Sequence, residues 1–143
     1  MAACAIRYRL DGYTENEEES YLVGKISFFE DDEADDEKIL QPLADEVLEL
    51  FMRVAAAAQE IAGERGRLPD LSGARPQELS FLIAAAFNFN AAAKYEILKT
   101  RSTVERLEKL RRKIRESVKK IEENAETTRI AKTNGHSKRK IDL

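Results

Sequence analysis

Residues 36–63 read DEKILQPLADEVLELFMRVAAAAQEIAG. Apolar residues recur there every three or four positions, which is the spacing of one face of an α-helix. They are Leu40, Leu43, Val47, Leu50, Phe51, Val54, Ala58 and Ile61. Pro42 falls in the first two turns, where a missing N–H does little harm, and Gly63 suits the end of a helix. The stretch therefore predicts one long amphipathic helix.

Three more helices are expected after it. One follows Pro76 and covers residues 77–87, and a short one covers 91–99 with Asn90 as its N-cap. The last starts at Ser102, which forms a capping-box pattern with Glu105. Its apolar stripe has a spacing of about 3.5 residues, as in coiled coils, and consists of Val104, Leu107, Leu110, Ile114, Val118 and Ile121. Residues 127–143 lose this periodicity, and we expect a disordered basic tail there.

Two strands are expected before the long helix. Residues 5–10 alternate apolar and basic side chains, the pattern of a half-buried strand, and residues 21–29 are β-branched and aromatic. The turn-prone pair Asp11-Gly12 begins the connection between them, and the acidic run 30–37 is expected to be a mobile loop. The predicted class is α+β and helix-dominated, with a β hairpin at 5–29 and a four-helix bundle at 36–126. A two-stranded hairpin is only marginally stable alone.

The composition excludes several function classes. Of the 143 residues 36% are charged, yet the net charge is only −3 because an acidic front balances a basic back. The single cysteine, Cys4, rules out a disulfide framework and a cysteine zinc site, and the single histidine, His136, rules out a Ser-His-Asp triad. No apolar run approaches the roughly 20 residues of a membrane span, and the N-terminus is unlike a signal peptide. We expect a cytoplasmic protein without catalytic residues, cofactor or metal.

Three pieces of the chain resemble the substrate-binding domain found at the N-terminus of Lon protease and in stand-alone bacterial proteins. The first is the strand at 7–10 followed by Tyr21-Leu22-Val23-Gly24-Lys25-Ile26, and the second is the long helix at 39–61. The third is the run from Pro76 to Phe87 with the pieces at 94–98 and 102–107 that follow it. Each motif is mainly structural, and it is their order and spacing over about residues 5–112 that carry the resemblance.

The resemblance implies a PUA-like β subdomain followed by helices, with residues 1–126 forming a partial domain of this kind. Most of the family's β subdomain would precede Ile6, and the sequence has no counterpart of it. Nor does it contain a phosphate-binding loop or a Ser-Lys catalytic pair. The resemblance therefore implies binding of protein substrates, and not ATP hydrolysis or proteolysis.

The candidate protein-binding residues fall into three groups: Tyr21, Phe28 and Phe29 on the hairpin; Phe89 between helices; Val118 and Ile121 on the last helix. Each has a plainer interpretation as a core residue. Two main functions are open. One is a Lon-type substrate-binding or adaptor module for unfolded or tagged segments. The other is a helical interaction protein that self-associates through the uncovered C-terminal half of its last helix. Nucleic-acid binding is disfavoured because acidic residues are interspersed with the basic ones there.

Overall fold

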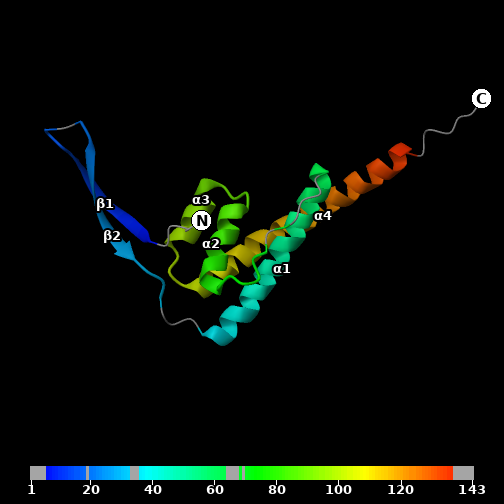
Figure 1. The fold of residues 1–143 in the computed structure, drawn as a ribbon, viewed down its shortest axis with the longest axis horizontal. Coiled ribbons are helices and arrows are strands. Elements are labelled where there is room, and N and C mark those ends of the chain that lie inside the picture. The colour runs from blue at the N-terminus through cyan, green and yellow to red at the C-terminus, as the bar shows by residue number, and fades with distance from the viewer. Residues whose placement is uncertain (1–5, 19, 33–35, 64–67, 69, 137–143) are drawn as a thin grey trace, which may run out of the picture.

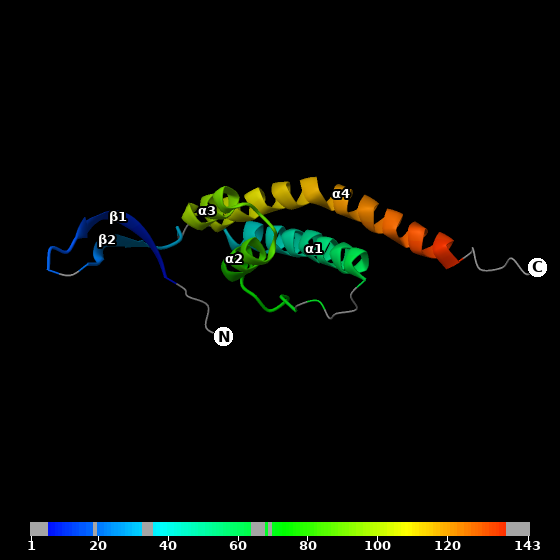
Figure 2. The same ribbon diagram turned by 90° about the horizontal axis from the view of Figure 1, so that it is seen from above.

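A computed structural model of the chain describes residues 6–18, 20–32, 36–63, 68 and 70–136. Two strands, β1 (Arg7–Glu15) and β2 (Leu22–Phe29), precede four helices, α1 (Glu37–Ala62), α2 (Pro76–Ala86), α3 (Ala91–Lys99) and α4 (Thr103–His136). The strands form an arm that projects from one end of the helical part, and α4 extends past the other end (Figures 1 and 2). The predicted helix-dominated α+β class is confirmed.

The core lies between α1 and α4, which run in the same direction. Glu46 of α1 pairs with Arg111 and Arg115, and further along Arg53 pairs with Glu122. Residues later in α1 therefore contact residues later in α4, as expected for two parallel helices. The apolar residues that α4 buries most completely are Leu107, Leu110 and Ile114, each 0% exposed. On α1 the core residues are Leu40, Leu43, Ala44, Val47, Leu50, Phe51 and Val54.

Short helices bring the chain back so that α4 can start beside the start of α1. Pro76 opens α2, and the Asn90 side chain caps α3 by accepting from the amide of Ala93 at 2.8 Å. Ser102 Oγ accepts from the amide of Glu105 at 3.1 Å, which confirms the predicted N-cap of α4. Leu79, Ile83 and Ile97 then pack into the same core.

The hairpin is longer than the sequence suggested. β1 and β2 pair antiparallel, with Tyr8 opposite Phe28, Leu10 opposite Ile26 and Tyr13 opposite Gly24. Asp11-Gly12 does not begin the connection as expected; the register shifts there, so the pair forms a bulge within β1. Asp11 is held in place because its carboxylate accepts from Ser27 Oγ of β2.

Two expectations about α4 are wrong. The helix does not end near Glu126 but continues to His136, so only residues 137–143 of the predicted tail lie outside the described residues. Thr127 and Thr128 bond back to carbonyls four residues earlier, and Arg129 pairs with Glu126, within this extension. Nor is the C-terminal half of the apolar stripe uncovered, because Val118 is buried and Ile121 partly buried against the core that α1 lines.

This arrangement predicts a sharp contrast between two isoleucines of α4. Ile114→Ala should lower the free energy of unfolding by about 2–5 kcal/mol, because it leaves a cavity at a fully buried site. Ile130→Ala, at a side chain that is 50% exposed, should change it by less than about 0.5 kcal/mol. Urea unfolding followed by circular dichroism measures both values. Equal losses would contradict this placement of the core.

Candidate functional site

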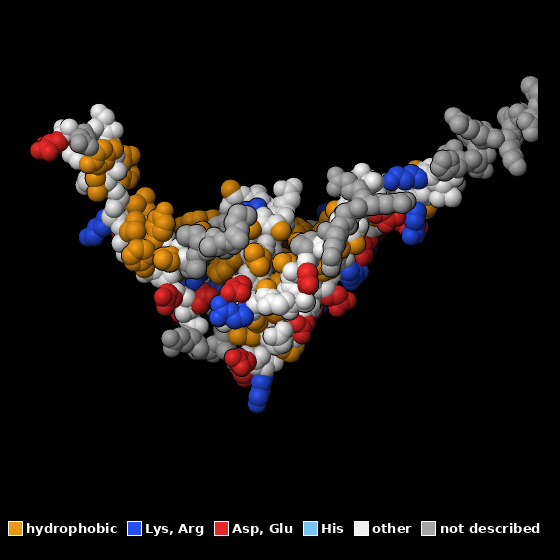
Figure 3. Space-filling model, viewed as in Figure 1, with side chains coloured by type: hydrophobic (Ala, Val, Ile, Leu, Met, Phe, Trp, Pro, Cys, Tyr) orange, Lys and Arg blue, Asp and Glu red, His pale blue; other side chains and the backbone are white. Residues whose placement is uncertain are grey.

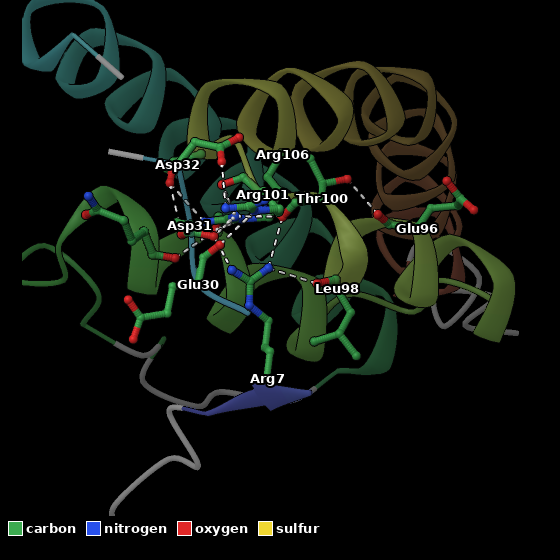
Figure 4. Close-up of polar contacts among 12 residues, drawn as sticks. Arg7, Glu30, Asp31, Asp32, Glu96, Leu98, Thr100, Arg101 and Arg106 are labelled. Carbon is green, nitrogen blue, oxygen red and sulfur yellow. Dashed lines mark hydrogen bonds and ion pairs between the residues drawn. The ribbon is translucent and has the colours of Figure 1, made fainter. Parts of the chain in front are cut away.

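A buried ion cluster fastens the arm to the helices. Asp31, in the connection between β2 and α1, accepts two hydrogen bonds of 2.6 Å from the guanidinium of Arg106 on α4. Arg7 of β1 pairs with the same carboxylate from the other side (Figure 4). We call Arg7, Asp31 and Arg106 the Asp31 cluster. It joins the hairpin to the last helix across 75 residues of sequence.

Every N–H of Arg106 has an acceptor, although its side chain is 0% exposed. Besides the two bonds to Asp31, Nε donates to Ser80 Oγ at 3.0 Å, and the remaining two donors reach the Thr100 carbonyl and Thr103 Oγ1, both at 2.9 Å. The Phe81 ring stacks on the guanidinium with its centroid 4.3 Å away. A buried cation satisfied in this way is stable only if all its partners are in place.

Arg7 repeats the arrangement at the base of the hairpin. Its guanidinium lies between the rings of Phe29 and Phe81, at 4.7 and 5.1 Å from their centroids. It also donates to the carbonyls of Leu98 and Thr100, at 2.9 and 3.0 Å. The arm is therefore fixed by directional bonds to the end of α3 as well as to Asp31 (Figure 4).

The charges of this cluster favour the ionised form of Asp31. Burial opposes ionisation and would by itself raise the pKa of this carboxyl. The hydrogen bonds and positive charges of Arg106 and Arg7 outweigh that effect and hold the pKa below its ordinary value. The carboxylate is therefore charged in the folded protein at neutral pH.

The hairpin turns an apolar face to solvent. The register places six apolar side chains on one side of the sheet, and each is between 43% and 68% exposed. These residues, here called the apolar hairpin face, are Tyr8, Leu10, Tyr13, Leu22, Ile26 and Phe28. The space-filling view shows apolar side chains along the arm down to where it meets the helices (Figure 3). The opposite side of the sheet carries Arg7, Arg9, Lys25 and Ser27 together with Val23 and Phe29, so it is the more polar of the two sides.

Gly24 leaves room for the Leu10 side chain on this face. Leu10 Cδ1 lies 3.1 Å from the position that a Cβ at residue 24 would occupy. The Leu10 side chain therefore lies across β2 in the space that the glycine leaves open.

The structure separates the predicted site residues. Phe28 belongs to the apolar hairpin face, and Tyr21 lies just before β2 and is also exposed. Phe29 points to the other side of the sheet, under Arg7. Phe89 stacks against Phe87 with a centroid distance of 4.4 Å and is packed on the core. Val118 and Ile121 are core positions, so neither is part of an exposed site.

The sequence reasoning missed most of the exposed face and the whole Asp31 cluster. The alternation of Ile6, Tyr8 and Leu10 with Arg7 and Arg9 was interpreted as a half-buried strand with the apolar side inward. In the structure neither side of this strand is covered along its length, because Tyr8 and Leu10 are more than half exposed and Arg9 is 75% exposed. Only Arg7, at the base, is packed, with its side chain 12% exposed. The even-numbered apolar residues of β2 were the available signal for the exposed face. No local sequence feature distinguishes Asp31, which pairs with two arginines, from the other acidic residues in 30–37.

Within the described residues, no three histidine, cysteine or acidic side chains are grouped to hold a metal ion. None of the helices in that part of the chain is long and apolar enough to cross a bilayer. Cys4 lies outside the described residues.

Comparison with known families decides what this domain is. The family model described as the ATP-dependent protease La (LON) substrate-binding domain matches residues 3–116. The chain belongs to this family. The match covers the hairpin, α1 to α3 and the first part of α4, and therefore includes both the Asp31 cluster and the apolar hairpin face. The comparisons gave no match among curated proteins and none among solved structures.

Removing the carboxylate of the cluster should be costly. Asp31→Ala leaves two arginines without their shared partner, one of them fully buried, and we expect a loss of about 3–5 kcal/mol in the free energy of unfolding. Asp32→Ala is the matched control, because Asp32 pairs with Arg101 at the surface and such pairs contribute about 1 kcal/mol or less. Urea unfolding at neutral pH measures both. A loss for Asp31→Ala no larger than for Asp32→Ala would contradict the role of the cluster.

Acid should weaken the same link. Because the pKa of Asp31 is lower in the folded chain than its ordinary value near 3.9, the stability it contributes is present above about pH 4–5. That contribution is lost as the pH falls through the folded-state pKa. The stability difference between the wild type and Asp31→Asn should therefore shrink on acidification. Urea unfolding of both proteins at several pH values tests this, and a difference that stays constant down to about pH 2 would refute it.

Proposed function

We propose that this Lon-type domain is a non-catalytic substrate-binding or adaptor module that captures extended apolar segments of unfolded proteins on the apolar hairpin face. The observation that supports the proposal is the exposure of six large apolar side chains on one side of a two-stranded arm. Apolar patches of this size on a folded protein typically mark interaction sites.

The expected affinity suits transient capture. Covering one large apolar side chain contributes roughly 1.5–3 kcal/mol, so three or four of them supply about 5–12 kcal/mol before losses. Ordering an unfolded segment and restricting its motion offset a large part of that gain. Micromolar binding, about −8 kcal/mol, is therefore the upper range for a single segment. Such a site releases its client readily.

The attachment of the arm supports this function. Arg7 and Phe29 project from the polar side of the hairpin into contacts with the helices. Because these contacts use only that side, the apolar side stays free. The Asp31 cluster thus holds the binding face in a fixed position, which lowers the entropy lost when a segment binds.

The alternative of a helical interaction protein has less support. The stripe expected to associate with another chain is occupied by α1 of the same chain, down to Val118 and Ile121. Nucleic-acid binding is also disfavoured, because Arg111 and Arg115 of α4 pair with Glu46, and Lys109 pairs with Glu105. These cations are therefore partly neutralised.

Binding of a permanently unfolded protein tests the proposal. Fluorescein-labelled α-lactalbumin, reduced and carboxymethylated, should bind to the wild-type chain with a measurable change in anisotropy. The double variant Tyr13→Ser with Phe28→Ser should bind at least about tenfold more weakly, because two exposed aromatic contacts are removed.

The matched control for that experiment is Tyr95→Ser. Tyr95 of α3 is 63% exposed but lies outside the hairpin, so its loss should leave binding unchanged. Circular dichroism establishes that all variants retain their helices. Absence of binding by the wild type, or equal binding by the hairpin double variant, would refute the proposed function.

A further inference from the structure

We infer that Arg7 is the latch that sets the direction of the hairpin relative to the helices, and that it closes in a slot specific for a guanidinium group, which the helices and Asp31 form without it. The polar groups of the slot are the Asp31 carboxylate and the carbonyls of Leu98 and Thr100. The ring of Phe81 forms an apolar wall. These contacts join the hairpin to the helices, so the latch is independent of where a client binds and of any further strand beside β1 or β2.

The helices hold Asp31 without help from Arg7. Both oxygens of its carboxylate accept a hydrogen bond of 2.6 Å from the guanidinium of Arg106, which is fully buried. The next residue, Asp32, donates its amide to the Arg101 carbonyl at 3.2 Å and pairs with the Arg101 guanidinium at 3.0 Å. Two successive residues of this segment are thus bonded to the start of α4. Removing the Arg7 side chain therefore leaves the Asp31 carboxylate in place.

The end of α3 positions the two carbonyls of the slot. Leu98 lies in the last turn of this helix, and Thr100 is its C-cap. The amide of Thr100 donates to the Ile97 carbonyl at 3.3 Å, and its Oγ1 donates to the Glu96 carbonyl at 2.7 Å. The last carbonyls of a helix lack amide partners within it and carry partial negative charge, so they attract a cation. The slot therefore offers fixed acceptors before Arg7 enters it.

The slot fits a flat cation with donors on two nitrogens. Nη1 of Arg7 donates to both carbonyls, at 2.9 and 3.0 Å, while Nη2 donates to the Asp31 carboxylate (Figure 4). The rings of Phe29 and Phe81 flank the guanidinium, with centroids 4.7 and 5.1 Å from its central carbon. An ammonium group has all its donors on one nitrogen and is more strongly hydrated, so it gains less between two rings. We therefore expect guanidinium to bind here in preference to ammonium.

Arg9 shows how different the position of Arg7 is. Both arginines lie on the same side of β1, but Arg9 is 75% exposed and its Nε donates to Asp11 of the same strand at 2.8 Å. The bonds of Arg9 therefore stay within the hairpin, whereas those of Arg7 leave it. Losing Arg7 should free the direction of the arm while the pairing of β1 with β2 and the helical core persist. Losing Arg9 should change neither.

Pulsed electron paramagnetic resonance measures the freedom of the arm. Spin labels are attached at Thr14→Cys near the tip of the hairpin and at Glu108→Cys on α4, both exposed positions, in a chain whose native thiol is removed by Cys4→Ser. Arg7→Ala should widen the distribution of distances between the labels at least about twofold, because the arm then turns about its connection to the helices. Arg9→Ala is the matched control and should leave the width as in the wild type. Circular dichroism checks that both variants retain their helices.

Binding of a small guanidinium compound tests the slot itself. Ethylguanidinium, far below the concentrations that denature proteins, should raise the melting temperature of Arg7→Ala but not that of the wild type, in which Arg7 fills the slot. Ethylammonium at the same concentration should raise it several-fold less. The rings of Phe29 and Phe81 should give the bound ethyl protons a saturable upfield shift in the NMR spectrum. Arg7→Lys keeps the positive charge, yet it should still widen the distance distribution, because an ammonium group does not match the slot.

Three results would overturn the inference. If Arg7→Ala leaves the width of the distance distribution unchanged, other contacts direct the arm and Arg7 is not its latch. If Arg7→Ala loses the helical circular dichroism signal, the arginine is part of the core and not a detachable latch. If ethylammonium raises the melting temperature as much as ethylguanidinium, or if neither binds, no guanidinium-specific slot exists without Arg7. The binding of unfolded α-lactalbumin decides none of these points, so the proposed function can fail while the latch holds.

Discussion

The buried guanidinium of Arg106 constrains how the helices and the segment after β2 pack together. Arg106 is completely enclosed by the helices, and an enclosed cation requires an anion and a full set of acceptors. Asp31 supplies the anion, and Ser80, Thr100 and Thr103 supply the remaining acceptors. These groups come from α2, the end of α3, the start of α4 and the segment after β2. Meeting the needs of one side chain therefore fixes the positions of α2, the end of α3 and the segment after β2 relative to α4.

The same requirement fixes the base of the hairpin. Arg7 shares Asp31 with Arg106 and stacks between Phe29 and Phe81, so this end of β1 is held against the helices. The rest of the arm projects from the helical part, and Arg9 on the same side of the sheet is 75% exposed (Figure 1). The six residues of the apolar hairpin face are exposed as well, because the helices contact the arm only at its base.

The sequence predicts those parts of the fold that are determined by local periodicity. The helices follow from apolar spacing, and the caps at Asn90 and Ser102 follow from side chains that bond to amides three residues later. The pairing of α1 with α4 could not be predicted, because many pairings bury the same apolar stripes. Val118 was therefore expected to lack a partner, although α1 lies against it.

The Asp31 cluster could not be predicted from the sequence either, but for a different reason from the pairing of α1 with α4. Seven of the eight residues from Glu30 to Glu37 are acidic, and repulsion among them favours an exposed loop. Only the distant Arg7 and Arg106 single out one member, and neither residue is marked by periodicity. The segment is a loop at Asp31 and Asp32, as expected, but Asp31 is anchored, while residues 33–35 lie outside the described residues.

An exposed apolar strand edge carries a risk of uncontrolled aggregation, and the hairpin limits that risk without closing the site. The bulge in β1 makes one edge irregular, and the acidic tip repels the tips of other copies. Lys25 places one charge at the middle of β2 but on the polar side, where it leaves the apolar hairpin face intact. The edge that stays regular is therefore the edge that adjoins Leu22, Ile26 and Phe28. Charge at the tip also disfavours a second hairpin in parallel alignment, so the residues of the turn oppose self-association of the exposed hairpin.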